Sequence, residues 1–203
     1  LIISISFFIC IIGFIDDRIN LNPSVKVLFI IIPSAYLILN GISIYDLGDY
    51  EYIGILSLGK FQLPFLILST GLLINATNYI DGVDGLLLTF FICCLGYYIF
   101  LIDETNTIYL LKILLVPVVL NLIMNLLPYK SKIKIFSGNT GSLFIGFFIS
   151  FLTIELYNSF SIHPVYLIWP LWYPVYDFLF VSTNRAILKK SIESANLYNI
   201  ELR

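Results

Sequence analysis

The 203-residue chain is 59% hydrophobic and only 12% charged, and its mean hydropathy is +0.96. This composition excludes an ordinary soluble domain and indicates an integral membrane protein. The formal net charge of −2 gives no basic excess, and we expect no nucleic-acid partner.

Seven apolar runs of helical length are predicted to cross the membrane, at residues 1–15, 25–42, 63–80, 85–102, 107–127, 141–157 and 164–182. Helices satisfy their backbone hydrogen bonds internally, as a membrane requires. We therefore expect an all-α polytopic helical bundle in one domain, 1–203. The short first run and the initial Leu1 suggest a fragment, or a gene model that lacks its start. Between the second and third runs, 43–62 is predicted to form a small hairpin or interfacial element.

The orientation of the bundle follows from its basic residues. If the loop at Asp16-Asp17 is cytoplasmic and the spans alternate, the cytoplasmic side holds nine of the eleven basic residues. These nine are Arg18, Lys26, Lys130, Lys132, Lys134, Arg185, Lys189, Lys190 and Arg203; only Lys60 and Lys112 lie outside. The positive-inside rule favours this topology. It also brings the loops around 16–17, 75–85 and 130–142 and the tail after 177 to one face, which predicts a single cytoplasmic site.

The first polar motif is Gly13-Phe-Ile-Asp16-Asp17-Arg18, at the end of an apolar run. Adjacent residues on a helix point about 100° apart, so the two carboxylates need not serve one ligand. One aspartate could bind a cation or act as a base while Arg18 holds the other. A solvated helix end is an equally good interpretation of this motif alone.

The second motif is Asn75-Ala-Thr-Asn-Tyr-Ile-Asp-Gly-Val-Asp-Gly-Leu86. Its Asn78, Asp81 and Asp84 recur every three residues and lie near one face if the turn is helical. Ionisable groups at a membrane edge are candidates for function. Magnesium takes one or two carboxylates together with substrate phosphates and waters, and Asn78 could add its carbonyl oxygen. The alternative is a glycine-rich turn at the membrane edge.

The third motif is Phe136-Ser-Gly138-Asn-Thr-Gly141-Ser142, just before an apolar run. Free backbone N–H groups at a helix start can cradle a phosphate. Lys130, Lys132 and Lys134 lie upstream and would attract an anionic nucleotide or lipid headgroup. A basic loop before a capped helix start is the more common origin of such a pattern.

Asp177 and Arg185 flank the end of the last run, eight residues apart, and could line one helix face. Its three prolines, at 164, 170 and 174, predict a kink that a bundle can accommodate. His163 falls on the outer side, where we expect an interfacial histidine with satisfied hydrogen bonds and no catalytic role.

These three motifs, in this order and spacing, resemble the polyprenyl-phosphate N-acetylhexosamine-1-phosphate transferases, a superfamily that includes the phospho-MurNAc-pentapeptide translocase. The Asp-Asp-Arg form is more similar to the branch that uses UDP-GlcNAc. The resemblance implies about ten or eleven membrane helices in the bacterial inner (plasma) membrane. It implies transfer of sugar-1-phosphate from a UDP-sugar to undecaprenyl phosphate, with release of UMP. It makes UDP-N-acetylhexosamine, polyprenyl phosphate and membrane lipids the expected partners and leaves a homodimer open.

The resemblance also implies roles for residues. Asp16 or Asp17 would deprotonate or position the lipid phosphate, and Asp81 would support the catalytic centre. Mg²⁺, with Mn²⁺ as an alternative, would be held near Asn78 and Asn139. Asp84 would lie near the uracil. Substrate binding is expected from Asn75, Asp84, Lys134, Gly138, Ser142 and Arg185.

Three departures from the family pattern matter. The glycine loop of the family carries Asp where this chain has Asn139, which should weaken metal binding. Ser191–Arg203 contains no counterpart of the family's histidine motif, so the chain either stops short of this motif or has lost it, and the helices expected before Asp16 are absent. The resemblance thus implies a single domain that is truncated at both ends. A degenerate, non-catalytic membrane protein of the same fold is therefore the alternative hypothesis. A transporter fits poorly, because the carboxylates lie at the ends of spans.

Overall fold

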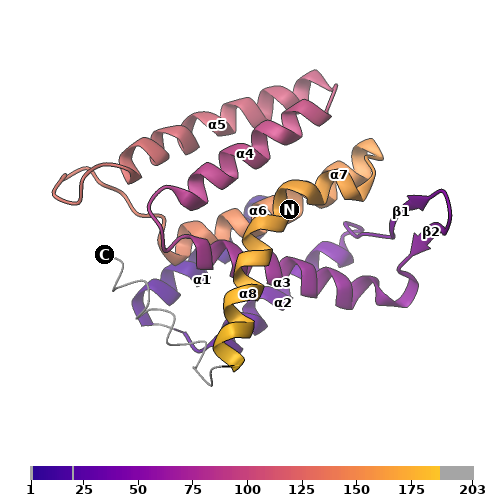
Figure 1. Ribbon diagram of the computed structural model, residues 1–203, viewed down its shortest axis with the longest axis horizontal. Coiled ribbons are helices and arrows are strands. Elements are labelled where there is room, and N and C mark those ends of the chain that lie inside the picture. Colours follow the sequence, from indigo (N-terminus) through magenta and orange to yellow (C-terminus); the bar gives the residue numbers. More distant parts are fainter. Residues whose placement is uncertain (1, 20, 188–203) are drawn as a thin grey trace.

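The computed structural model describes residues 2–19 and 21–187 and is mainly helical in these ranges (Figure 1). The elements are α1 (Ile2–Ile19), α2 (Pro23–Leu39), β1 (Asp46–Tyr50), β2 (Gly54–Ser57), α3 (Gln62–Ile80), α4 (Leu86–Leu101), α5 (Thr105–Asn125), α6 (Gly138–Phe160), α7 (Pro164–Ile168) and α8 (Trp172–Ile187). Short 3-10 turns occupy Gly59–Phe61 and Trp169–Leu171. Lys189, Lys190, Arg203 and the segment without histidines lie outside the described residues.

Three helical stretches in the described ranges are long and apolar enough to cross a membrane: Gly59–Ile80, Thr105–Asn125 and Gly138–Phe160. Leu86–Leu101 is apolar but shorter. The structure is thus consistent with the expected polytopic helical membrane fold, with one small β-hairpin added, whereas the number of seven spans stays a prediction.

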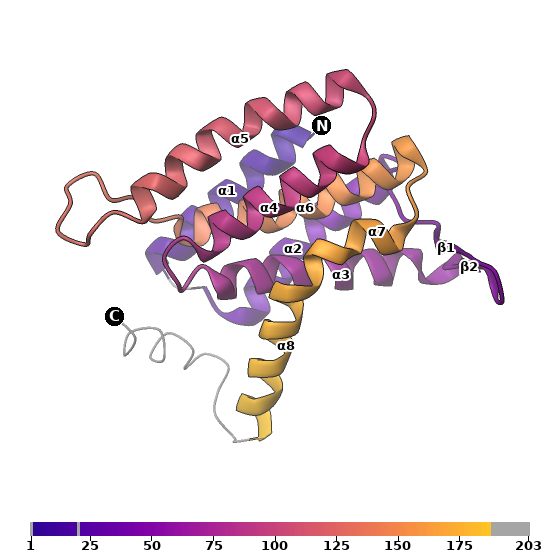
Figure 2. The same cartoon turned by 45° about the horizontal axis from the view of Figure 1, so that its top comes forward.

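Helix α6 lies at the centre of the bundle, between the α4–α5 pair and helices α1 to α3 (Figures 1 and 2). It approaches α3 very closely at Gly146. A Cβ atom there would lie 2.2 Å from Thr77 Oγ1 and 2.8 Å from Ile74 Cα. Small residues allow this backbone approach between membrane helices. The Thr77 hydroxyl uses the proximity and donates a hydrogen bond to the Ser142 carbonyl oxygen at 3.1 Å.

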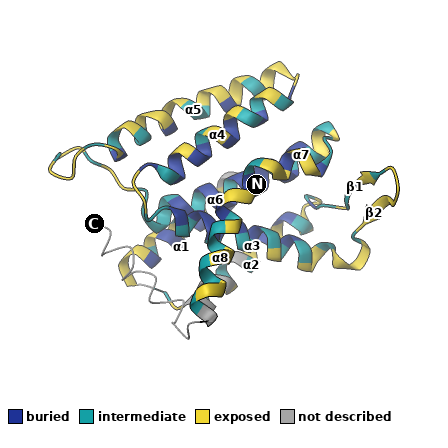
Figure 3. Cartoon of the chain, viewed as in Figure 1, coloured by how far each residue is buried: buried dark blue, intermediate teal, exposed yellow. Residues whose placement is uncertain are grey.

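Two apolar cores flank α6. One contains buried side chains of α4, α5 and α6, including Phe91, Tyr98 and Ile149. The other joins α1, α2 and α3 to α6 and includes Leu37, Leu66 and Phe147. Helix α5 leaves most of its apolar surface exposed (Figure 3), as expected of a helix that faces lipid. The two cores together fix the position of α6, whose first turn enters the candidate site.

The predicted run 164–182 is broken into α7, a 3-10 turn and α8. Pro170 lies in the turn and Pro174 in the first turn of α8, where the missing N–H costs little. In Figures 1 and 2, α8 turns away from the direction of α7, and it packs against α3. The predicted proline kink is therefore confirmed.

Residues 43–62 contain the predicted hairpin. Strands β1 and β2 pair antiparallel, with Tyr50 opposite Gly54. His163 packs edge-on against the Tyr50 ring, with centroids 5.2 Å apart, and its Nε2 lies 3.3 Å from the Asp49 carbonyl oxygen. The expectation of a satisfied histidine is confirmed. The hairpin precedes α3 and the second motif follows it, so His163 and the motifs lie at opposite ends of the molecule.

Candidate functional site

Three helix ends that carry the predicted motifs meet at one end of the bundle. These are the C-terminal ends of α1 and α3 and the first turn of α6, on the left in Figure 1. Two hydrogen bonds join them: Asn139 N donates to Asp17 Oδ1 at 2.8 Å, and Asn78 Nδ2 donates to Asn139 Oδ1 at 2.7 Å. The partners are 122 and 61 residues apart in sequence. The predicted convergence of these three segments is confirmed.

The Asp17 carboxylate caps the first turn of α6. Its Oδ1 accepts the Asn139 N–H, and its Oδ2 accepts the Thr140 N–H at 3.1 Å and the Thr140 hydroxyl at 2.8 Å. A carboxylate at a helix N-terminus is favourable because the first N–H groups lack helical acceptors. The prediction of free N–H groups for a phosphate is therefore wrong for residues 139 and 140, which bind the chain's own carboxylate.

The neighbouring Asp16 lies in a different environment. Its side chain is fully buried, and Oδ1 accepts a hydrogen bond from the Leu21 N–H at 2.9 Å. Because consecutive helical residues diverge, Asp16 faces inward while Asp17 is exposed and faces α6. The Arg18 guanidinium lies 5.2 Å from the centre of the Phe14 ring. Asp17 is thus held by α6 and not, as one interpretation expected, by Arg18.

Asn78 reaches from α3 to α6 with its amide nitrogen. This Nδ2 donates both to Asn139 Oδ1 and to Ser142 Oγ, the latter at 2.8 Å. Ser142 is fully buried, and its hydroxyl also donates to the Gly138 carbonyl oxygen at 3.0 Å. In this structure the Ser142 hydroxyl is buried and bound by protein groups, and direct substrate binding by Ser142 stays a prediction. The hydroxyl holds Asn78.

The loop after α3 is tied to the segment before α6 by a residue that sequence reasoning missed. Asn125, at the end of α5, accepts the Gly85 N–H on Oδ1 at 2.6 Å and donates from Nδ2 to the Ile135 carbonyl oxygen at 2.9 Å. Gly85 has a φ of 77°, a conformation that glycine adopts without strain. Asn125 is only 5% exposed. An amide near the end of the apolar run 107–127 was the available signal. Asp81, at the end of α3, opens this same loop.

Asp84 and Lys134 form an ion pair between the two loops. Lys134 Nζ lies 2.7 Å from Asp84 Oδ2 and also donates to the Leu127 carbonyl oxygen at 3.1 Å. The ammonium sits 5.1 Å from the centre of the Phe136 ring. The Asp84 side chain is half exposed, so the pair contributes little to stability. The two residues predicted to bind nucleotide are side by side, whereas Lys130 and Lys132 remain exposed.

Arg185 returns from α8 to the site end of α3. Its guanidinium carbon lies 5.6 Å from the centre of the Tyr79 ring, and Phe178 packs edge-on against the same ring at 6.1 Å. Tyr79 is two residues before Asp81, so the structure brings Arg185 near the second motif, as predicted.

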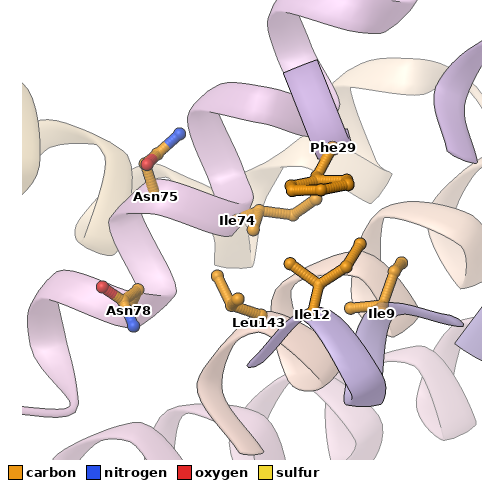
Figure 4. A pocket seen from close by; sticks show the side chains of 7 residues that line it. All are labelled: Ile9, Ile12, Phe29, Ile74, Asn75, Asn78 and Leu143. Carbon is orange, nitrogen blue, oxygen red and sulfur yellow. The ribbon is translucent and has the colours of Figure 1, made fainter. Parts of the chain in front are cut away.

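Asn75 lies one turn before Asn78 and donates from Nδ2 to the Gly71 carbonyl oxygen at 2.7 Å. Both amides lie at the edge of a small cavity, where Figure 4 shows apolar side chains gathered beside them. Its apolar lining residues are Ile9, Ile12, Phe29, Ile74 and Leu143. Asn75 is thus near the site, and substrate binding by its side chain stays a prediction.

The side chains of the site can be tested for their fit to a magnesium ion. Both predicted amide ligands already share a hydrogen bond, from Asn78 to Asn139. Among residues 2–19 and 21–187, no group of three or more His, Cys, Asp or Glu could hold a metal ion. Asp81, directly after α3, is the one carboxylate that the family resemblance assigns to this centre, and magnesium can bind through one carboxylate if phosphates and waters complete its shell. The residues fit a cation that arrives with a diphosphate better than one held by protein alone.

Curated relatives share the chain's sequence at low identity. The "Probable undecaprenyl-phosphate N-acetylglucosaminyl 1-phosphate transferase" of Bacillus subtilis is 28% identical over 205 residues, covering 98% of this chain and 56% of the relative. The "Undecaprenyl-phosphate alpha-N-acetylglucosaminyl 1-phosphate transferase" of Escherichia coli K12 is 24% identical over 189 residues, covering 86% and 49%. The chain therefore spans about half the length of these relatives. No solved structure matches the chain.

A family comparison covers most of the chain, including all three motifs. The profile of "Glycosyl transferase family 4" matches residues 1–157, from α1 to near the end of α6. This match contains each helix end that meets at the site. On this match, together with the arrangement of the three motifs, the chain belongs to glycosyl transferase family 4.

Proposed function

We propose that the protein carrying this chain transfers N-acetylhexosamine-1-phosphate from a UDP-sugar to undecaprenyl phosphate and releases UMP. The product would initiate a cell-envelope glycan, such as lipopolysaccharide O-antigen. The observation that carries this proposal is the meeting of α1, α3 and α6 at Asp17, Asn78 and Asn139. Family membership and the names of the bacterial relatives support it. The excess of basic residues on the motif side favours a cytoplasmic site at the plasma membrane.

The chemistry proposed is phosphoryl transfer, in which positioning and electrostatic stabilisation dominate. Bound Mg²⁺ would neutralise charge that develops on the diphosphate, and Asp81 with the oxygens of Asn78 and Asn139 would hold it. Asp84 and Lys134 lie together at the exposed side of the site, where they would receive the nucleotide. Arg185 adds a positive charge near Tyr79 for the substrate phosphates.

A direct assay tests this proposal. Membranes from cells that express the encoding gene are incubated with UDP-GlcNAc, undecaprenyl phosphate and Mg²⁺, and UMP is measured. Release of UMP that requires both the lipid and the cation supports the proposal. UMP formation without the lipid would indicate hydrolysis, and no release with UDP-GlcNAc or UDP-GalNAc would contradict the proposed activity.

A non-catalytic protein of the same fold is the second candidate, and Asn139 favours it. Its neutral amide accepts a hydrogen bond from Asn78 where the family carries a carboxylate. We expect Asn139→Asp to keep this hydrogen bond in a stronger, charge-assisted form and to add a negative charge for the cation. Magnesium-dependent UMP release should then rise about 10-fold to 100-fold.

The matched control is Asn106→Asp, an exposed position in the first turn of α5 at the other end of the molecule. It should leave UMP release unchanged. A large gain for Asn139→Asp alone identifies a weakened enzyme. An inactive Asn139→Asp protein with an unchanged melting temperature favours the non-catalytic candidate.

An open apolar groove of about 530 Å³ lies between α3, α6 and α8 and is the proposed site for part of the prenyl chain. Phe65, Trp172 and Leu179 are among its lining residues. We expect Ser69→Phe, which fills the groove, to raise KM for undecaprenyl phosphate about 10-fold while KM for the UDP-sugar is unchanged. Leu68→Phe is the control, because Leu68 is 68% exposed and outside the groove lining. Equal lipid KM values for the two variants would contradict this assignment.

A further inference from the structure

One face of α1 is built to hold the first turn of α6. Gly13 and Asp17 are four residues apart and therefore lie on the same side of this helix. At Gly13 an added Cβ would lie 2.5 Å from Thr140 Cα and 2.9 Å from the Asn139 carbonyl oxygen. Glycine thus lets the two backbones touch, and Asp17 then reaches the N–H groups of Asn139 and Thr140.

We propose that Asp17 is a positioning residue, whose carboxylate fixes the first turn of α6 and so sets Asn139 in the site. Its catalytic effect, which rests on the proposed function, would be indirect. Gly13 contributes to the same contact between α1 and α6, because a larger residue at this position would push α6 away from Asp17.

The contacts of Asn139 explain how the effect is transmitted. Its backbone N–H is bound by Asp17 on α1, while its side-chain oxygen accepts from Asn78 on α3. Asn139 is therefore held between α1 and α3, two helices that are distant from it in sequence. Gly138, with a φ of 61°, starts the turn, and its added Cβ would lie 3.1 Å from Asp17 Oδ2. Without the Asp17 carboxylate, the backbone N–H of Asn139 would lose its hydrogen-bond acceptor on α1.

The alternative role of Asp17 is that of a general base, and the conservative variant separates the two. Asn is as good a helix cap as Asp, whereas Ala is a poor one. In Asp17→Asn, Oδ1 can still accept the Asn139 N–H, and Nδ2 can donate to the Thr140 hydroxyl, whereas the Thr140 N–H loses its acceptor. Asn therefore keeps part of the cap, and Ala keeps none. The amide cannot, however, take a proton from a substrate at neutral pH.

The experiment compares Asp17→Asn and Asp17→Ala in purified full-length protein, with Asp103→Ala on the exposed α4–α5 loop as control. We expect Asp17→Asn to retain kcat and KM for the UDP-sugar within about 10-fold, and Asp17→Ala to raise this KM about 10-fold to 100-fold. Asp17→Ala should also lower the melting temperature by roughly 2–6 °C, and Asp17→Asn should lower it less. KM is measured on the folded enzyme, so a loss of folded protein alone would not change it.

Two results would overturn the proposal. If both variants lose kcat by roughly 10²–10⁴-fold with KM unchanged, Asp17 acts as a base. If Asp17→Ala equals the wild type in KM and melting temperature, the cap has no effect. If the wild type itself releases no UMP, the proposed function fails separately. In that case the melting temperatures of Asp17→Ala, Thr140→Val and the double variant still test the cap. Non-additive decreases in melting temperature support the contact between Asp17 and the first turn of α6, and additive decreases refute it.

Discussion

Asp81→Asn is expected to lower kcat for UMP release about 10²–10³-fold, the size of effect seen when a group that stabilises transition-state charge is removed. Asp81 ends α3 directly after the hydrogen-bonded Asn78 turn and opens the loop that Asn125 ties to the segment before α6. Asp81 follows Asn78 by three residues, at the end of α3 that meets α1 and α6, and the family resemblance assigns it to the catalytic centre. The measurement is UMP release against Mg²⁺ concentration.

The control for this variant is Asp103→Asn, which removes the same charge from an exposed loop at the far end of α4. It should not alter UMP release. If Asp81→Asn kept full magnesium-dependent activity, the proposed phosphoryl-transfer centre would be wrong. A loss of activity that excess Mg²⁺ restores would instead assign Asp81 mainly to binding the cation.

Gly146→Ala is expected to destabilise the bundle and to disturb the site together. The new methyl group would lie 2.2 Å from Thr77 Oγ1 and 2.8 Å from Ile74 Cα, and the second atom belongs to the backbone. Helices α3 and α6 must therefore separate, at a typical cost of about 1–3 kcal/mol for overpacking. The melting temperature should fall by roughly 2–12 °C. Because Asn78 directly follows Thr77 and Ser142 lies one turn before Gly146, nucleotide KM should rise as well.

Gly96→Ala provides the matched control within a neighbouring helix. Apart from the adjacent residues and backbone of its own helix, nothing lies within 4 Å of the Cβ position at Gly96, so the change should stabilise α4 slightly through helix propensity, by about 1 kcal/mol at most. Opposite shifts in melting temperature for the two variants, measured by tryptophan fluorescence, would support the close α3–α6 contact. Equal shifts would contradict it.

Much of the architecture could be predicted from local patterns. The apolar run 141–157 lies within α6, the run 63–80 lies within α3, and the stretch 43–62 contains the hairpin. Prolines in the run 164–182 indicated the break between α7 and α8. Counting spans and basic residues predicted that the motifs at 16–17, 75–85 and 136–142 share one face. These predictions rest on the length and hydropathy of each apolar run and on the alternation of successive spans across the membrane. None of these properties depends on how the helices pack.

The partners of individual side chains were less predictable. The sequence placed Asp17 and the Gly138–Thr140 turn on one side of the membrane, but not within 3 Å of each other. It predicted substrate binding by Ser142, but not the burial of this residue beneath Asn78. It gave no role to Asn125, which joins two loops through Gly85 and Ile135. Such contacts depend on the rotation and separation of helices that are distant in sequence.

The sequence by itself determined that this is a helical membrane protein, where its helices begin and end to within a few residues, and which helix ends share a face. The reason is that hydrocarbon imposes length and polarity on each segment independently. Only the tertiary structure decided that Asp17 caps α6 while Asp16 is buried, and that Asn139 lies between Asp17 and Asn78. Those outcomes follow from the backbone contacts at Gly13 and Gly146, which set the distance and rotation of α1 and α3 against α6.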